Sequence, residues 1–238
     1  MEVNVKGITV RTVDYKDSDK IITVFTLESG KISVSAHGIR KATAKMKAIA
    51  EPFCFAESVL IFKSGRYTLK EINVIDTFYP IRTDIVKYYA GMTALEFTNA
   101  VMQENLEAKE YFVLLVEFLK KLAYSTEKPK NALIEFLAGA LKDSGYSIDF
   151  SRCGRCGNEI SGRVYLSVSD GCNCCENCKT AGDREYSVDT YNYLKAVVGG
   201  QGVEYSDDFS GNALKFFAYY INSVTGVELR SLETLINI

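Results

Sequence analysis

The chain has 238 residues, of which 47% are hydrophobic and 24% are charged, and its formal net charge is −2. These proportions are those of a globular protein that can bury a sizeable core, and they exclude a disordered chain. A single histidine and the absence of tryptophan exclude most chemistries that depend on a histidine base or a histidine metal ligand.

The charge is distributed unevenly along the chain. Residues 1–80 hold twelve lysines and arginines against nine acids, a net of +3, and the remainder holds 16 against 21, a net of −5. A locally basic first part indicates a polyanionic partner. No stretch approaches the about 18 consecutive apolar residues of a membrane span, and the first ten residues lack the pattern of a secretory signal. We therefore expect a cytoplasmic protein without a membrane partner, whose seven cysteines are metal ligands or free thiols.

The first part of the chain is rich in β-forming residues. Strands are expected at residues 5–13, 20–27, 31–36, 53–62 and 67–75, and the pairs Ser29-Gly30 and Ser64-Gly65 mark tight turns between them. Five short strands with one long connection predict a small closed barrel of the OB type. An open five-stranded sheet is the alternative.

The long connection is basic. Residues 30–50 contain five cations and no acid, namely Lys31, Arg40, Lys41, Lys45 and Lys47. Because the stretch follows a strand and lacks helix caps, we expect a mobile, exposed loop that can neutralise phosphates without reading base sequence. OB barrels also stack bases on aromatic side chains, and the nearby aromatic residues are Phe53, Phe55, Phe62 and Tyr67. The alternative is a solvated basic loop that only keeps the protein soluble.

Helices are expected from residue 83 onward, at about residues 83–103, 108–124, 131–144, 187–198, 211–224 and 231–236. Thr83 and Asp84 offer capping at the first helix, Gly145 ends the third, and a break rich in glycine includes Gly199, Gly200 and Gly202. We predict an α+β multidomain protein. It has an OB-fold domain at residues 1–80 and a helical domain at residues 81–238, into which a cysteine module at about residues 150–183 is inserted.

Six of the seven cysteines lie in this module. Two CxxC pairs, Cys153 with Cys156 and Cys175 with Cys178, are separated by eighteen residues, a spacing typical of a structural zinc site. Cys172 also forms a CxxC with Cys175, so the set of Cys153, Cys156, Cys172 and Cys175 is an alternative. A group of buried thiols or disulfides is another.

A zinc ion on four cysteines is expected to be structural. Four thiolates close the coordination shell, whereas a catalytic zinc keeps an open position. The chain has no HxE motif, which zinc deaminases require, and no GxxxxGK[ST] or GxGxxG phosphate loop. The lone His37 is expected at the surface, and Cys172 and Cys174 are expected to be free thiols. Nothing in these motifs indicates a nucleotidase or a helicase.

The run GITVRTVDYKDSDKIITVFT spans residues 7–26 and is followed by GKI at 30–32, GIRK at 38–41 and PF at 52–53. In this order, these segments resemble the bacterial RecO family of DNA repair proteins. The order of barrel, helices, four-cysteine module and closing helices is similar over essentially the whole chain.

The resemblance implies a cytoplasmic, nucleoid-associated recombination mediator that is not an enzyme. Such a protein binds single- and double-stranded DNA and anneals complementary strands. With RecR, and in many bacteria RecF, it helps to load RecA onto DNA coated by single-strand-binding protein. The resemblance places the DNA contacts on Arg40, Lys41, Lys45 and Lys47, with Lys31, Lys63 and Arg66 as weaker candidates. It places one structural zinc ion on Cys153, Cys156, Cys175 and Cys178.

Two other functional classes are alternatives. A zinc-ribbon module for protein interaction would have the same cysteines without any direct DNA contact, and reversing the charges of residues 38–47 would then leave its function unchanged. A zinc hydrolase would need an open ligand position. The chain also departs from the family by its additional Cys172 and Cys174, which add sensitivity to oxidation.

Overall fold

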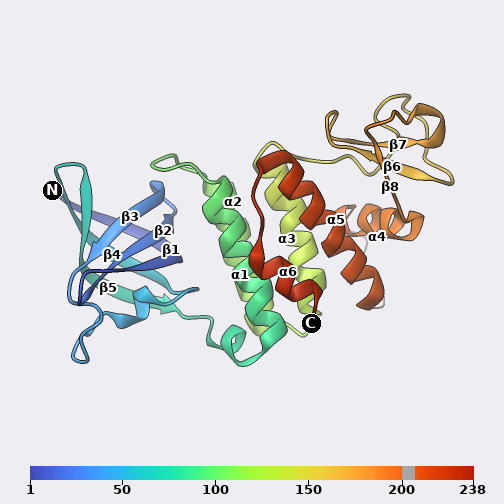
Figure 1. The fold of residues 1–238 in the computed structure, drawn as a ribbon. Helices are drawn as coiled ribbons and strands as arrows, with labels where there is room; N and C mark the ends of the chain where they lie inside the picture. Colours follow the sequence, from blue (N-terminus) through green and yellow to red (C-terminus); the bar gives the residue numbers. More distant parts are fainter. Residues whose placement is uncertain (200–206) are drawn as a thin grey trace. The chain divides into compact units, whose positions relative to one another are not determined.

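The structure, a computed structural model, describes residues 1–199 and 207–238. The chain forms two compact units, Met1–Glu127 and Lys128–Ile238, which are described separately (Figure 1). Of the predicted break that is rich in glycine, Gly200 and Gly202 lie outside the described residues. None of the described helices is long and apolar enough to cross a membrane.

The first unit begins with a closed barrel of five strands (Figure 1). The strands are β1 (Glu2–Tyr15), β2 (Asp19–Thr26), β3 (Gly30–Ala36), β4 (Phe55–Lys63) and β5 (Arg66–Asp76). Their order is β1-β2-β3-β5-β4, and β4 pairs back onto β1. Only β3 and β5 pair in parallel. The predicted barrel of the OB type is therefore confirmed, and the open sheet was the wrong alternative.

The alternation of side chains along the strands explains the closure. In β3, Ile32 and Val34 are buried in the barrel core, whereas Ser33 between them is exposed. Ile39 and Ile49, from the connection after β3, join the same core. That connection ends in the short 3-10 helix η1 (Lys47–Ala50), so it is anchored to the barrel at both ends.

Two helices follow the barrel within the first unit. After the 3-10 helix η2 (Tyr79–Thr83), α1 (Ile85–Val101) and α2 (Lys109–Tyr124) form. Asp84 caps α1 as predicted, because its side chain accepts a hydrogen bond from the Lys87 backbone amide at 2.9 Å.

The described residues of the second unit form four helices and a small sheet. The helices are α3 (Pro129–Asp143), α4 (Val188–Val198), α5 (Asp207–Thr225) and α6 (Arg230–Ile236). The predicted stop after α3 is confirmed: Gly145 has φ 82°, and the next amide, of Tyr146, donates to the Leu141 carbonyl at 2.8 Å.

The sheet lies between α3 and α4 in sequence. Its strands are β6 (Val164–Ser167), β7 (Cys172–Cys175) and β8 (Arg184–Tyr186), in the order β7-β6-β8. The 3-10 helix η3 (Glu176–Cys178) follows β7 directly. The division of the chain at residue 80 stays a prediction, while α1 and α2 group with the barrel in the compact unit that ends at Glu127.

Candidate metal centre and nucleic-acid interface

The two CxxC pairs come together at one end of the small sheet. The first pair sits in a tight turn, in which the Gly157 amide donates to the Cys153 carbonyl at 2.8 Å and Gly157 itself has φ 75°. The second pair starts at the last residue of β7 and ends with η3. As a result, the sulfur atoms of Cys153, Cys156, Cys175 and Cys178 all lie within 4.8 Å of one another.

This geometry fits a single tetrahedral ion. At a zinc–sulfur distance of 2.3 Å, neighbouring sulfurs of a tetrahedron lie about 3.8 Å apart, and the Sγ atoms of Cys156 and Cys175 are 3.9 Å apart. The donors are four soft thiols, which close the shell and leave no position for a substrate. These four cysteines could therefore hold a metal ion, and Cys172 is not part of the group.

Backbone amides favour negative charge at this group. Burial would raise the pKa of Cys153, but hydrogen bonds from the backbone of Cys175, Cys156 and Arg155 outweigh it and lower that pKa to about 6. The Cys175 amide lies 3.5 Å from the Cys153 sulfur. By contrast, hydrogen bonds with Cys156 and Cys175 raise the pKa of Cys178 to about 12. The surroundings of Cys153 thus favour its thiolate and those of Cys178 favour its thiol, and a bound cation would favour the thiolate of both.

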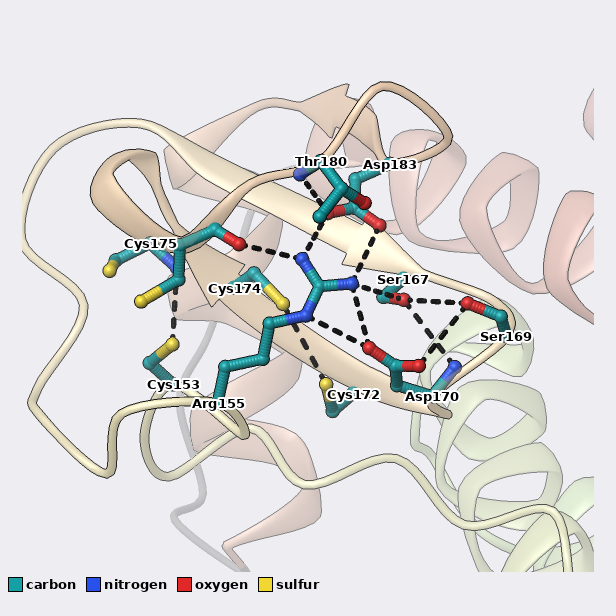
Figure 2. Close-up of polar contacts among 11 residues, drawn as sticks. Cys153, Arg155, Ser167, Ser169, Asp170, Cys172, Cys174, Cys175, Thr180 and Asp183 are labelled. Carbon is teal, nitrogen blue, oxygen red and sulfur yellow. Dashed lines mark hydrogen bonds and ion pairs between the residues drawn. The ribbon is translucent and has the colours of Figure 1, made fainter.

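Arg155, inside the first CxxC, ties the module together (Figure 2). Its Nε and Nη2 donate to the Asp170 carboxylate at 2.9 and 2.7 Å, and its Nη1 and Nη2 donate to Asp183. The Ser167 hydroxyl accepts from Nη2 at 3.0 Å, and the Cys178 carbonyl accepts from Nη1 at 2.7 Å. One guanidinium therefore joins the first metal-binding turn to β6, to the turn before β7 and to the end of the second CxxC.

The ion pairs with Arg155 lower the pKa values of both acids. Burial would raise the pKa of Asp183, which is almost fully buried, but the hydrogen bond from Arg155 and that from the Thr180 backbone lower it to about 2. The hydrogen bond from Arg155 also lowers the pKa of Asp170. Sequence reasoning missed this network. Its only local signal is an arginine between two cysteines, which does not identify partners 15 and 28 residues away.

The basic loop, residues 37–47, projects from the end of β3 and is fixed by hydrogen bonds. The Asp19 carboxylate accepts from the Gly38 amide at 2.7 Å and contacts His37 Nδ1 at 2.9 Å. The Arg40 amide donates to the Ser18 carbonyl at 3.0 Å. Its anchoring differs from the freely mobile loop that the sequence predicted, because Asp19 and the turn before it lie beside the end of β3. The prediction that His37 lies at the surface is confirmed.

The Asp19 carboxyl is held in its charged form. The hydrogen bonds from the Gly38 backbone and from His37 lower its pKa to about 2. The carboxylate therefore fastens the basic loop to the turn between β1 and β2 at any pH above that value.

Four predicted contact residues lie together on this loop. Arg40, Lys41, Lys45 and Lys47 are all exposed. Arg40 is near Asp14, at 3.4 Å, but among the described residues Lys41 and Lys45 have no carboxylate partner. Lys16, which sequence reasoning missed, is exposed on the adjoining turn, where Arg40 Nη1 donates to its carbonyl at 3.4 Å. The sequence feature that could have identified Lys16 is its position in the turn before β2.

The structure does not bring the three weaker candidates to the same place. Lys31 is half-buried, and its Nζ donates to the Asn99 carbonyl at 2.6 Å. Lys63 ends β4 and Arg66 begins β5, next to the residues that pair with the start of β1. The basic loop instead adjoins the far end of β1. The predicted cations thus divide among three separate positions.

Two of the four aromatic residues predicted near the loop, Phe53 and Phe55, are buried and not available for stacking. Phe53 is buried, with its ring against Gly91 of α1, where even a Cβ would come within 2.8 Å of the ring. Phe55 is buried against Phe112 of α2. Their hydrophobic area holds α1 and α2 to the barrel, so the sequence interpretation was wrong for these two residues. Phe62 and Tyr67 are half-buried, and their ring centroids lie 4.8 Å apart. Among the aromatic residues beside the loop, Tyr15 is exposed.

Comparison with known proteins agrees with this architecture. The family model "Recombination protein O N terminal" matches residues 1–78, and "Recombination protein O C terminal" matches residues 82–233. A DNA repair protein RecO of Clostridium novyi is 28% identical over 236 residues, which are 96% of this chain and 91% of that protein. The Clostridium perfringens protein of the same name is 27% identical, over 96% and 95%. That of Bacillus pumilus is 30% identical, over 75% and 69%.

Proposed function

The chain belongs to the RecO family of recombination and DNA repair proteins, and we propose that its barrel binds DNA through the basic loop after β3. The observation that carries this proposal is the fixed loop on which exposed Lys41 and Lys45 lack carboxylate partners among the described residues. Lysines without such partners can release the counterions of DNA phosphates, and this release supplies most of the affinity in binding that does not depend on sequence.

The same surface accounts for strand annealing. Cations on a fixed loop lower the repulsion between the phosphates of two complementary strands, and they require no particular base sequence. Arg40, Lys41, Lys45 and Lys47 provide the main contacts in this proposal. Lys31, Lys63 and Arg66 are secondary, because they lie elsewhere on the barrel. Binding to both single- and double-stranded DNA follows from contacts to phosphates alone.

The partners follow from the family resemblance. We propose that the protein works with RecR and RecF to load RecA onto DNA coated by single-strand-binding protein at the nucleoid. It acts by bringing molecules together and not by catalysis, in agreement with a cysteine group that has no open ligand position.

The metal in this proposal is one structural zinc ion on Cys153, Cys156, Cys175 and Cys178. Zinc would supply the positive charge that lets all four thiols ionise, and it would fasten the two CxxC turns to each other. Around it, Arg155 holds the same two turns through Asp170, Asp183 and the Cys178 carbonyl.

The test is the annealing of two complementary labelled oligonucleotides by the purified protein. The variant Lys41→Glu/Lys45→Glu should lose most of the annealing rate, and the slope of its DNA affinity against salt should fall by about 2 on a double-logarithmic plot. Lys63→Glu/Arg66→Glu, which changes the charge of the same barrel by the same amount, is the matched control and should retain most of both. Each protein is first checked for folding by circular dichroism.

Two results would contradict the proposal. Equal losses in the two variants would show that only the net charge of the barrel matters and that the loop is not the site. A folded wild-type protein that neither binds nor anneals DNA would favour the alternative of a module for protein interaction.

A further inference from the structure

Two cysteines of the module lie outside the four-sulfur group. Cys172 and Cys174 are both in β7, two residues apart, so their side chains are on the same face of the sheet. Their Sγ atoms are only 3.7 Å apart (Figure 2). Cys174 is fully buried, whereas Cys172 is partly exposed. We propose that this pair is a site of reversible oxidation, at which a hydroperoxide converts the two thiols into a disulfide.

The surroundings favour a disulfide over a second metal ion. Among the described residues, only the group without Cys172 and Cys174 assembles three or more ligands that could hold a metal. The guanidinium of Arg155 lies beside Cys174 (Figure 2), and a fixed positive charge opposes a cation there. A covalent bond between the two sulfurs introduces no charge and therefore meets no such opposition.

The geometry allows the bond but strains it. A disulfide needs Cα atoms 4.4–6.8 Å apart and sulfurs at about 2.05 Å. Residues two apart in a strand have Cα atoms separated by about 6.4–6.8 Å, the upper end of that range. Strained disulfides are more easily reduced, so we expect the bond between Cys172 and Cys174 to be reversible under the action of a dithiol reductant.

Gly154 gives Cys172 its place beside the first CxxC. A Cβ on Gly154 would lie 2.4 Å from the Cys172 Cβ and 2.6 Å from its sulfur. The Cys172 side chain thus occupies the space that any larger residue at position 154 would need. Oxidation at Cys172 therefore takes place in contact with the turn that carries Cys153 and Cys156.

The exposure of the two thiols assigns their roles. The sulfur of Cys172, the partly exposed residue of the pair, attacks one oxygen of hydrogen peroxide and becomes a sulfenic acid, with release of one water. The Cys174 sulfur then attacks the Cys172 sulfur and displaces the hydroxyl group as a second water. In sum, two thiols and one hydrogen peroxide yield one disulfide and two waters, and the peroxide is the species that is reduced.

The other cysteines are expected to react more slowly. Cys54 is fully buried in the barrel core. The four cysteines of the metal group are protected while an ion holds their thiolates, so selectivity for Cys172 and Cys174 rests on the metal site proposed above. The metal content is therefore measured in the same samples, and a failure of the metal proposal can be told apart from a failure of the oxidation proposal.

The experiment treats the purified full chain with hydrogen peroxide, denatures it with a chelator, alkylates it with N-ethylmaleimide and locates the modified residues by fragmentation mass spectrometry. Of the seven cysteines, Cys172 and Cys174 should escape alkylation and appear as one disulfide, 2 Da below the mass of the reduced peptide. Zinc content before denaturation should stay unchanged, and dithiothreitol should restore both thiols.

Single variants identify the two roles. Cys174→Ser should stop at a sulfenic acid on Cys172, which dimedone traps, and Cys172→Ala should show no oxidation at Cys174. Because Cys174 is buried and its replacement could disturb folding, Cys172→Ala gives a second and independent test at a partly exposed position. Cys54→Ala, outside the module, is the control and should form the same disulfide between Cys172 and Cys174 as the wild-type protein does.

The proposal is overturned if Cys172 and Cys174 both remain fully alkylated while other cysteines oxidise. It is also overturned if their oxidation occurs only after zinc has left, because the sulfurs that react would then be those of a disordered module. A protein that contains no zinc but still forms the disulfide between Cys172 and Cys174 would retain this inference and refute the metal proposal.

Discussion

The barrel and the cysteine module are stabilised in opposite ways. The barrel buries a continuous apolar cluster that draws on all five strands and on the connection after β3. The module has three strands of only three or four residues each. It is held by a four-sulfur group and by one arginine with two carboxylates. The barrel is thus stabilised by many weak contacts, whereas the module is stabilised by a few strong ones.

The barrel and the module are therefore expected to lose stability in different ways when one side chain is replaced. The loss of one apolar side chain leaves the rest of a barrel core in contact, so the effect is graded. The loss of one metal ligand removes most of what orders a small metal-binding segment, because the binding energy of the metal is its folding energy. Substitutions of similar size should therefore have unequal effects in the two regions.

The largest effect is expected from Cys178→Ser. With three thiolates the proposed zinc site loses its closed shell, and structural zinc sites bind with about 10–16 kcal/mol in isolated finger peptides. Amide hydrogen exchange should increase over residues 150–187 and stay unchanged in β1–β5. Cys172→Ser, at a cysteine outside the group, is the control and should keep its protection. Unchanged exchange in both variants would show that metal binding does not order the module.

A smaller effect is expected from Ile22→Ala in the barrel. Ile22 is fully buried in the core, and a cavity of this kind lowers the free energy of unfolding by about 2–5 kcal/mol. Urea denaturation followed by circular dichroism measures it. Ile61→Ala, on an exposed side chain of β4, should change the stability by less than about 0.5 kcal/mol. A similar decrease in the free energy of unfolding in both variants would show that Ile22 does not lie in the barrel core.

Arg155→Lys should have an intermediate effect that is specific to the module. Lysine keeps the charge but has too few donors to serve Asp170, Asp183, Ser167 and the Cys178 carbonyl together. Residues that support metal ligands typically change metal affinity by about 10-fold to 100-fold, which competition with a chromophoric chelator would measure. Arg152→Lys, at an exposed position nearby, should leave the affinity unchanged. If Arg155→Lys bound the metal as tightly as the wild-type protein does, the hydrogen-bond network of Arg155 would not support the metal site.

The smallest effect is expected from Asp19→Asn, on the stability of the barrel at acidic pH. The pKa of Asp19 is lowered from 3.8 to about 2 in the folded protein, so its contribution to stability is complete above pH 3.8 and is lost as the pH falls through about 2. The urea midpoint of the wild-type protein should therefore fall more steeply between pH 4 and pH 2 than that of Asp19→Asn. Parallel pH profiles would show that Asp19 does not anchor the basic loop.

Local patterns in the sequence were sufficient for much of the fold. Runs of β-forming residues between turn pairs, with alternation at residues 31–36, predicted all five strands of the barrel, and the apolar faces and caps predicted the helices, because these signals lie within one element or beside it. The two CxxC pairs likewise predicted the four sulfurs that lie within 4.8 Å of one another, since a short turn can present two thiols by itself.

Other features depended on contacts between distant segments. Phe53 and Phe55 looked available for stacking, but α1 and α2 cover them. Seven cations looked like one basic surface, but the barrel register separates Lys63 and Arg66 from the basic loop.

The sequence by itself determined the five strands of the first unit, the helices and the two CxxC pairs, because these follow from residues close together in the chain. Only the tertiary structure decided that Arg155 would bind Asp170 and Asp183 and that Cys172 would face Cys174 rather than the metal group. The physical reason is that an ion pair or a thiol contact depends on distances of a few ångströms in space. Those distances are set by the packing of turns and strands against each other, and no spacing along the chain encodes them.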